Sequence, residues 1–140
     1  MIQINAVYSD RAFPLVKATE GSAGWDVCAS EYYTLSDNHV TMVDTGIKIE
    51  IPQGYEIQVR SRSGLALDGV CIANGVGTID SDYRGVIKVL MYSISGMKHI
   101  KRGDRVAQLV ISKVQDAEFV TVDTLSDTQR GAGGFGSTGK

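Results

Sequence analysis

The feature that most constrains this chain is a two-residue alternation of apolar and polar side chains. In the stretch GIKIEI, Ile47, Ile49 and Ile51 fall on one side, and Lys48 and Glu50 fall on the other. Because successive side chains of a strand point to opposite faces, this pattern is typical of a strand with one buried face. No stretch has the period of a long amphipathic helix. The sequence therefore predicts a protein built mainly of strands.

The same alternation recurs in segments that are bounded by glycine, asparagine and aspartate turns. YEIQVRSR continues it, with four polar residues on one face: Glu56, Gln58, Arg60 and Arg62. Further strands are predicted in VIKVLMY, DRVAQLVI and AEFVTV, at residues 86–92, 104–111 and 117–122. Short, closely spaced strands of this kind predict an all-β antiparallel barrel or jelly roll. In that fold SGLAL, at residues 63–67, would form at most one short helix.

The size and composition are those of one globular domain. The chain has 140 residues, of which 43% are hydrophobic and 21% charged, and its formal net charge is -2. A chain of this length can bury a core without disulfides or metals. The balanced charge excludes the broad basic surface of a general nucleic-acid-binding protein. We expect a single body of residues 1–129 followed by a glycine-rich C-terminal arm of residues 130–140.

The sequence predicts no targeting signal, membrane span or protein-built metal site. The N-terminus lacks a basic start followed by an apolar block, and no apolar run is long enough to cross a bilayer. Cys28 and Cys71 lack the spacing of zinc ligands and are predicted to be buried free thiols, whereas His39 and His99 are predicted to lie on the surface. We therefore expect a soluble cytoplasmic or nuclear protein that binds neither membranes nor nucleic acid.

The stretch RSRSGLAL combines a planar cation, a hydroxyl and an unhindered backbone amide at the end of a predicted strand. These groups come from Arg62, Ser63 and Gly64. Guanidinium binds phosphate oxygens in bidentate fashion, and glycine lets the main chain approach them closely. The alternative is a solvated arginine pair beside a turn, and Arg60 is expected to be structural.

The stretch NGVGTIDSDYRG carries two aspartates. In an extended segment Asp80 and Asp82 would point the same way, and neighbouring carboxylates repel unless a cation or a proton-transfer role offsets the repulsion. An aspartate near bound magnesium can deprotonate a water, as a phosphoanhydride hydrolase requires. The alternative is a turn whose aspartates pair with Arg84. Asn74 could read a base edge or simply occupy a left-handed turn, and Tyr83 could pack on a sugar or on the core.

Two further polar residues lie within predicted strands. Gln108 falls between Val106 and Val110 on one face of RGDRVAQLVI, so its amide must hydrogen-bond either the backbone or a ligand. Asp26, in AGWDVCAS, follows a glycine and an aromatic residue and could serve as a site residue or only as a cap or turn.

The last eleven residues, RGAGGFGSTGK, include five glycines. Glycine loses the most backbone entropy on ordering, so we expect this arm to become ordered only when a ligand contributes contacts. Arg130 can clamp a phosphate, Phe135 can stack on a flat ring, and Ser137 and Thr138 can contact terminal oxygens. The segment therefore predicts a lid for a nucleotide.

Taken in order, AGWDVCA, RSGLA, NGVGTIDSDYRG, RGDRVAQLVI and RGAGGFGSTG resemble the five motifs of the trimeric dUTP pyrophosphatases, the dUTPases. Five motifs in this order and spacing are far more specific than any one of them. The resemblance implies a jelly-roll subunit, a homotrimer with active sites at the subunit interfaces, and hydrolysis of dUTP to dUMP and pyrophosphate. That reaction keeps uracil out of DNA and supplies dUMP for dTMP synthesis. It also implies Mg²⁺ held through the substrate phosphates, without a direct protein ligand.

Carried over residue by residue, the resemblance makes Asp80 the base that activates water for attack on the α-phosphorus. Uracil would be read by Asn74, Gly77, Thr78 and Ile79, and deoxyribose would pack on Tyr83. The phosphates would be held by Arg62, Ser63 and Gly64, with support from Lys88 and Gln108. Asp26 would act through water near the metal. The arm that closes the site would use Arg130, Phe135, Gly136, Ser137 and Thr138.

Two alternatives remain at this point. The related dCTP deaminases share the fold and the RS-containing phosphate motif, but there a glutamate supports attack on the base, and the arm with its phenylalanine is not their signature. A nucleotide-binding or regulatory protein that has lost turnover is the other possibility. Asp80 and the intact arm argue against it.

Overall fold

The regular secondary structure of this chain is almost entirely β-strand, in keeping with the alternation of apolar and polar residues. The structure, a computed structural model, describes residues 1–137, and within that range it has eleven strands and one helix. The elements are β1 (Asn5–Tyr8), β2 (Gly24–Cys28), β3 (Tyr33–Leu35), β4 (Thr41–Asp44), β5 (Ile47–Glu50), β6 (Tyr55–Arg60), α1 (Ser63–Leu67), β7 (Val70–Ile72), β8 (Gly77–Ile79), β9 (Lys88–Ser93), β10 (Lys98–Ile100) and β11 (Arg105–Lys113). The prediction of an all-β fold with one short helix at residues 63–67 is confirmed.

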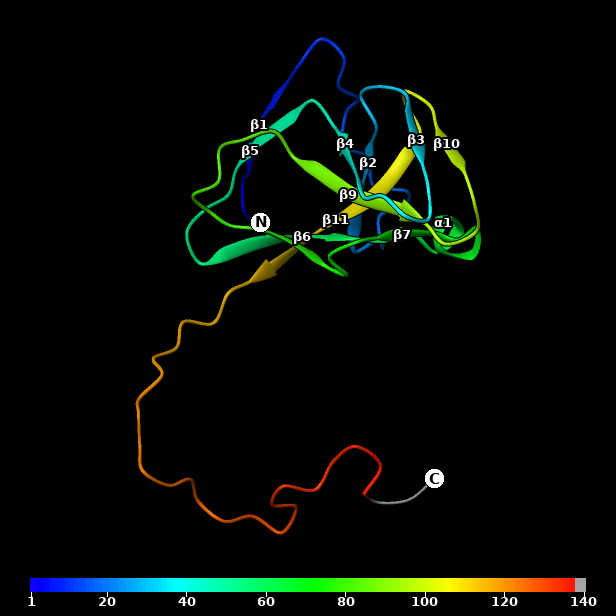
Figure 1. The fold of residues 1–140 in the computed structure, drawn as a ribbon. Coiled ribbons are helices and arrows are strands. Elements are labelled where there is room, and N and C mark those ends of the chain that lie inside the picture. Colours follow the sequence, from blue (N-terminus) through cyan, green and yellow to red (C-terminus); the bar gives the residue numbers. More distant parts are fainter. Residues whose placement is uncertain (138–140) are drawn as a thin grey trace.

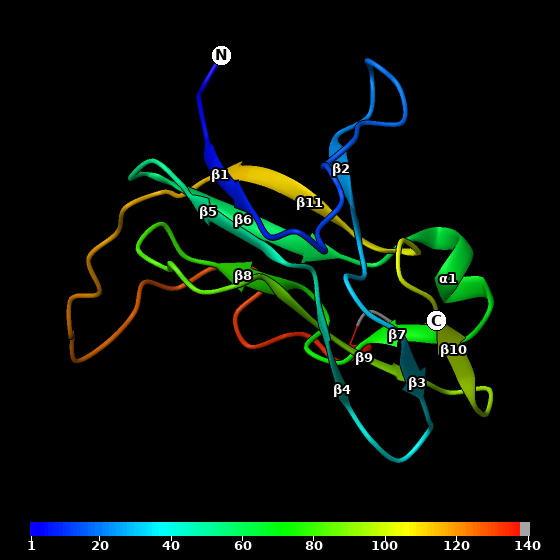
Figure 2. The ribbon, with the colours of Figure 1, turned by 90° about the horizontal axis from the view of Figure 1, so that it is seen from above.

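The strands pair into four antiparallel sheets. The largest has the order β2-β11-β6-β8 and the next β4-β9-β7, while β1 pairs with β5 and β3 with β10. Figure 2 shows β6 and β11 on one side of the body and β4, β7 and β9 on the other. The core lies between these layers and contains the apolar face of each strand, including Val27, Val43, Val89 and Leu109.

The short helix α1 joins the two larger sheets. It follows β6, and its N-cap, Arg62, still has an extended backbone with φ -97° and ψ 134°. The helix ends after one turn because Gly69 adopts a left-handed φ of +77°, a conformation that favours glycine. An added Cβ at Gly69 would also collide with the side chain of Ser95. None of the helical residues is buried, so α1 serves mainly to present the chain around Ser63 and Gly64.

The predicted strand at residues 117–122 is wrong. The last strand, β11, ends at Lys113, and the chain beyond it forms no strand in the described range. Phe119 is 100% exposed and Val122 57% exposed. A strand needs a neighbour to satisfy its backbone hydrogen bonds, and this segment runs away from its own body (Figure 1). The predicted division between residues 1–129 and 130–140 stays a prediction, because the exposed segment that follows β11 begins at residue 114.

We expect the core between the two large sheets to dominate stability. Leu109 lies in the central strand β11 with 1% of its surface exposed, whereas Leu67 on α1 is 91% exposed. Leu109→Ala should lower the free energy of unfolding by about 2–5 kcal/mol, because it removes buried methyl groups and leaves a cavity. The matched control Leu67→Ala should change it by less than about 0.5 kcal/mol. Urea unfolding at one fixed protein concentration measures both, and equal losses would contradict this view of the core.

Candidate active site

One pocket lies where the chain crosses from one large sheet to the other. β7 pairs with β9 and β8 pairs with β6, so residues 73–76 close the gap between the two sheets. We call it the hairpin pocket after residues 73–83, where the chain turns before and after β8, although β7 and β8 do not pair with each other; its volume is about 280 Å³. It is lined by Met42, Val59, Asn74, Gly77, Thr78, Ile79, Asp80, Tyr83, Ile87, Lys88, Val89 and Leu90. Seven of the predicted site residues therefore meet in one place.

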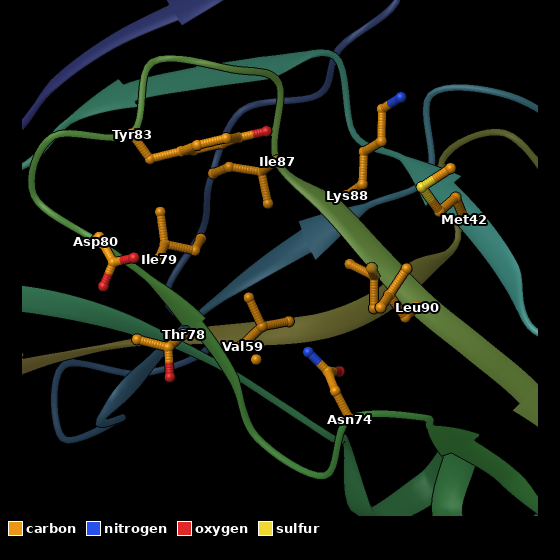
Figure 3. A pocket seen from close by; sticks show the side chains of 12 residues that line it. Met42, Val59, Asn74, Thr78, Ile79, Asp80, Tyr83, Ile87, Lys88 and Leu90 are labelled. Carbon is orange, nitrogen blue, oxygen red and sulfur yellow. The ribbon is translucent and has the colours of Figure 1, made fainter.

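Asn74 and Gly77 form the inner end of the hairpin pocket. Gly77 is opposite Val59 in the β6–β8 pairing, and a Cβ added there would lie 3.2 Å from both the Val59 Cβ and the Asn74 Nδ2. The missing side chain therefore makes room for the Asn74 amide, which points into the pocket in Figure 3. An exposed amide with an apolar floor beside it can exchange hydrogen bonds with the edge of a flat, polar ring.

Asp80 and Tyr83 form the outer end of the same pocket (Figure 3). Asp80 directly follows β8, and the Tyr83 amide donates to the Asp80 carbonyl over 3.1 Å. This turn replaces the extended segment in which Asp80 and Asp82 were expected to point the same way, so that expectation is wrong. The alternative pairing of Arg84 with these aspartates is also not observed, because its guanidinium lies 3.5 Å from Glu50.

Three further lining residues of the hairpin pocket come from β4 and β9. Lys88 begins β9, and its ammonium points away from Asp80 (Figure 3). Met42 and Leu90 are cross-strand partners in the second sheet and complete the wall opposite β8. Sequence reasoning missed these two because apolar residues in strands carry no signal that separates a pocket wall from a core.

A second pocket, which we call the loop pocket, lies beside the start of α1. Its volume is about 320 Å³, and its lining residues are Ala18, Ser22, Ala23, Gly24, Asp26, Arg62, Ser63, Gly64 and Gln108. It thus contains the five predicted residues of the phosphate and metal region that the hairpin pocket lacks. The two pockets share no lining residue.

Asp26 is the centre of an ion-pair network in the loop pocket. Its carboxylate accepts from the Arg62 Nε at 3.0 Å and from the Arg105 Nη1 at 3.1 Å, and only 15% of its side chain is exposed. Two guanidiniums compensate for the partial burial of this charge. Asp26 lies within β2, so it is neither a cap nor a turn residue.

Arg105 reaches Asp26 because of a β-bulge. The register between β2 and β11 shifts between Arg105, which is opposite Cys28, and Ala107, which is opposite Val27. The extra residue turns Arg105 to the face that carries Asp26 and leaves Val106 buried in the core. Val106 therefore does not share a face with Gln108, contrary to the simple alternation. No sequence signal identified Arg105, since a bulge is a property of the pairing.

Gln108 connects the central strand to the loop that precedes α1. Its Nε2 donates to the Ser61 carbonyl over 2.9 Å, which confirms a backbone partner for this amide. The Gln108 side chain lies across Gly24, where an added Cβ would be 2.6 Å from the Gln108 Oε1. The Gln108–Ser61 hydrogen bond thereby fixes the position of the Arg62–Gly64 loop relative to β11. The Arg60 guanidinium donates to Gln58 on the same strand, and its expected structural role stays a prediction.

The two cysteines are free, as predicted, but half-buried rather than buried. Burial raises the pKa of the Cys28 thiol above its ordinary value and outweighs the opposing effect of the nearby Arg105 charge.

Within residues 1–137 no group of three or more His, Cys, Asp or Glu side chains is arranged to hold a metal ion. The one helix in that range is not long and apolar enough to cross a membrane.

The predicted residues of the arm lie in neither pocket. Arg130 donates from its Nε to the Gly133 carbonyl over 2.9 Å, and Phe135 is fully exposed with a left-handed φ of 52°. Gly136 and Ser137 are also exposed. Thr138 lies outside the described residues. The predicted site residues thus form three separate groups, in the hairpin pocket, the loop pocket and the arm.

Comparison with known proteins agrees with the five motifs. A family model described as dUTPase matches residues 12–139. A deoxyuridine 5'-triphosphate nucleotidohydrolase of Zymomonas mobilis is 53% identical over 124 residues, which cover 87% of this chain and 85% of the relative. The protein of the same name from Helicobacter pylori (strain P12) is 44% identical over 140 residues, covering 99% of this chain and 96% of the relative.

Solved structures show the same fold. The Staphylococcus bacteriophage 80alpha dUTPase with dUPNHPP has a TM-score of 0.89 and 24% identity, with 100% of both chains covered. A mutant dUTPase from phage phi11 of S. aureus, described with a structural Mg(II) ion, has a TM-score of 0.81 and 22% identity, covering 88% of this chain and 98% of the phage chain. Because the family model matches nearly the whole chain and close relatives align over most of it, the chain belongs to the dUTPase family.

Proposed function

We propose that this protein hydrolyses dUTP to dUMP and pyrophosphate. The observation that carries the proposal is the hairpin pocket, where a carboxylate, a carboxamide and an aromatic ring surround an apolar floor. These groups match the three parts of a deoxyuridine nucleotide: a base with polar edges, a sugar that can pack on an aromatic ring, and an adjacent phosphorus. The names of its relatives support the same substrate.

In the proposed reaction Asp80 takes a proton from a water molecule. The water oxygen forms a bond to the α-phosphorus, the bond from that phosphorus to the bridging α–β oxygen breaks, and pyrophosphate leaves with the bonding electrons. Asp80 suits this role because it is exposed at the mouth of the hairpin pocket, next to the Tyr83 ring on which the sugar would pack.

Selectivity would come from the Asn74 amide together with the backbone from Gly77 to Ile79. The edge strand β8 pairs only with β6, so its other side has backbone groups available for a ligand. Uracil has a donor between two acceptors along one edge, and a fixed set of complementary groups would leave cytosine with unpaired or opposed partners.

The phosphates would bind in the loop pocket, where Arg62, Ser63 and Gly64 present a cation, a hydroxyl and an open main chain. Each Asp26 oxygen accepts one guanidinium N–H and keeps a second acceptor position, so a metal-bound water can donate to Asp26 while both arginines stay in place. Mg²⁺ bound through the substrate phosphates would neutralise their charge. Of this chain's residues, Asp26 is the one that we assign to its water shell.

We propose that the complete site forms between the subunits of a homotrimer. Within the described chain the hairpin pocket, the loop pocket and the arm share no residue. The hydrogen bonds of residues 120–137 all join partners inside that segment. An exposed arm with an unengaged phenyl ring is suited to cover a site on a neighbouring copy, with Phe135 over uracil and Arg130, Gly136, Ser137 and Thr138 around the terminal phosphates.

Asp80→Asn should abolish turnover and leave nucleotide binding nearly unchanged, since a general base acts on the transition state. We expect kcat to fall by about 10²–10⁴-fold and the Kd for a non-hydrolysable dUTP analogue to change by less than about tenfold. Asp82→Asn is the matched control, because Asp82 lies in the adjacent turn and lines neither pocket. Pyrophosphate release measures both variants. An Asp80→Asn enzyme with most of its activity refutes the assignment.

The protein should prefer dUTP over dCTP and dTTP by roughly 10⁴-fold or more in kcat/KM, because the polar groups around Asn74 would be left unpaired or blocked by other bases. Pyrophosphate release is measured for each nucleotide under the same conditions. Comparable kcat/KM values for dUTP and dCTP would contradict the proposed recognition of uracil. Ammonia release from dCTP would instead identify a deaminase.

Removal of residues 130–140, after Gln129, should leave the body folded, since the buried apolar core lies between Val27 and Leu109. The loss of contacts to the terminal phosphates should lower kcat by about 10²-fold or more. Circular dichroism and sedimentation should match those of the full chain, and pyrophosphate release reports the activity. If the truncated protein hydrolyses dUTP at the rate of the full chain, a lid function for the arm is excluded.

A further inference from the structure

Gly85 lies directly against the ring of Tyr83. A Cβ added to Gly85 would overlap the Tyr83 phenolic oxygen and would lie 2.5 Å from Cζ and 2.9 Å from Cε2. Real Cβ atoms do not approach other heavy atoms this closely. Gly85 does not have a left-handed φ, so its backbone conformation is open to other residues. Position 85 therefore requires glycine for steric reasons, because the Tyr83 side chain occupies the volume that a Cβ would need.

The Tyr83 ring is held at two points. Its Cε2, Cζ and hydroxyl oxygen lie against Gly85, and the hydroxyl donates to the Val86 carbonyl over 3.0 Å. Tyr83 as a whole is 44% exposed and lines the hairpin pocket beside Asp80. Figure 3 shows the ring lying across the outer end of the pocket with its hydroxyl directed toward the chain near Ile87. The ring is thus a fixed platform even though its surface is open to a ligand.

We propose that Gly85 is a specificity-determining positioning residue: by lacking a side chain it lets the Tyr83 ring lie close to the backbone, at the depth that admits a 2'-deoxyribose and excludes ribose. This inference rests on the proposed function, in which the sugar packs on Tyr83. Gly85 itself touches no reacting group. It acts through the ring that it supports.

The size of the effect follows from the geometry. To reach an ordinary carbon–carbon separation from an added methyl group, the ring has to move by about 1 Å, and its hydrogen bond to Val86 cannot survive unchanged. A misplacement of about 1 Å in a group that positions a substrate can cost about 100-fold in rate. A ribose differs from a deoxyribose by a single hydroxyl. A ring displacement of about 1 Å therefore alters the contact by which the site distinguishes the two sugars.

The test is Gly85→Ala, with kcat/KM measured for dUTP and for UTP by pyrophosphate release. The ratio of the two values should fall by at least about tenfold, because the displaced ring no longer enforces the sugar contact. Gly21→Ala is the matched control, since Gly21 has a permissive φ and no atom within 4 Å of an added Cβ. It should keep the wild-type ratio. A Gly85→Ala ratio equal to that of wild type overturns the proposal.

A double-mutant cycle separates positioning from general damage. With Tyr83→Ala the ring is gone, so adding Gly85→Ala should cause no further change in either kcat/KM. A Gly85→Ala effect of equal size with and without the ring overturns the proposal, because the effect would then not pass through Tyr83. If Gly85→Ala alone does not fold, Tyr83→Phe tests the same platform by removing the hydroxyl bound to Val86. It should lower the ratio, and an unchanged ratio overturns the proposal.

Failure of this inference differs from failure of the proposed function. If the unmodified protein releases no pyrophosphate from dUTP, the proposed function itself is wrong. If it does so with strong preference over UTP, and Gly85→Ala keeps that preference, only the role of Gly85 is wrong.

Discussion

The pairing of β11 with β2 on one side and β6 on the other is the constraint on which the rest of the structure depends. In this register Gln108 lies beside both Asp26 and Arg60, and Leu109 lies beside Trp25 and Val59. One face of the same strand therefore builds the core while the other carries polar groups. Any shift of one residue would exchange the two faces and destroy both.

The β-bulge in β11 modifies that constraint at one point and makes the loop pocket possible. Without it, strict alternation would place Arg105 on the same face as Ala107, which is buried in the core. With it, Arg105 joins Arg62 at the Asp26 carboxylate. The two arginines and the Gln108 contact to Ser61 hold the start of α1 against the sheet. The loop proposed to bind phosphate is thus positioned before a ligand arrives, which lowers the cost of ordering it.

The hairpin pocket has a different origin, because it depends on one chain segment that leaves the second sheet and enters the first. β7 ends in one sheet, β8 begins in the other, and the residues between them close the gap. Glycines at this site serve neighbouring side chains: Gly77 gives space to Asn74, and Gly85 gives space to Tyr83. The shape of the pocket is therefore set by missing side chains as much as by those present.

The sequence by itself predicted β5, β6, β9, β11 and the short helix, because alternation and turn signals depend only on near neighbours. It also named the polar residues Asn74, Asp80 and Tyr83 of the hairpin pocket and Asp26, Arg62 and Ser63 of the loop pocket, but not apolar wall residues such as Met42 and Leu90. It did not reveal that Arg105 faces Asp26, since a bulge depends on the register with another strand. It also suggested a strand at residues 117–122 from alternation alone, although no partner strand lies beside it in the described chain. The turn after Asp80 likewise replaced an extended segment. Only the tertiary structure decided the bulge and the missing strand, because strand partners are chosen by contacts between residues far apart in the sequence.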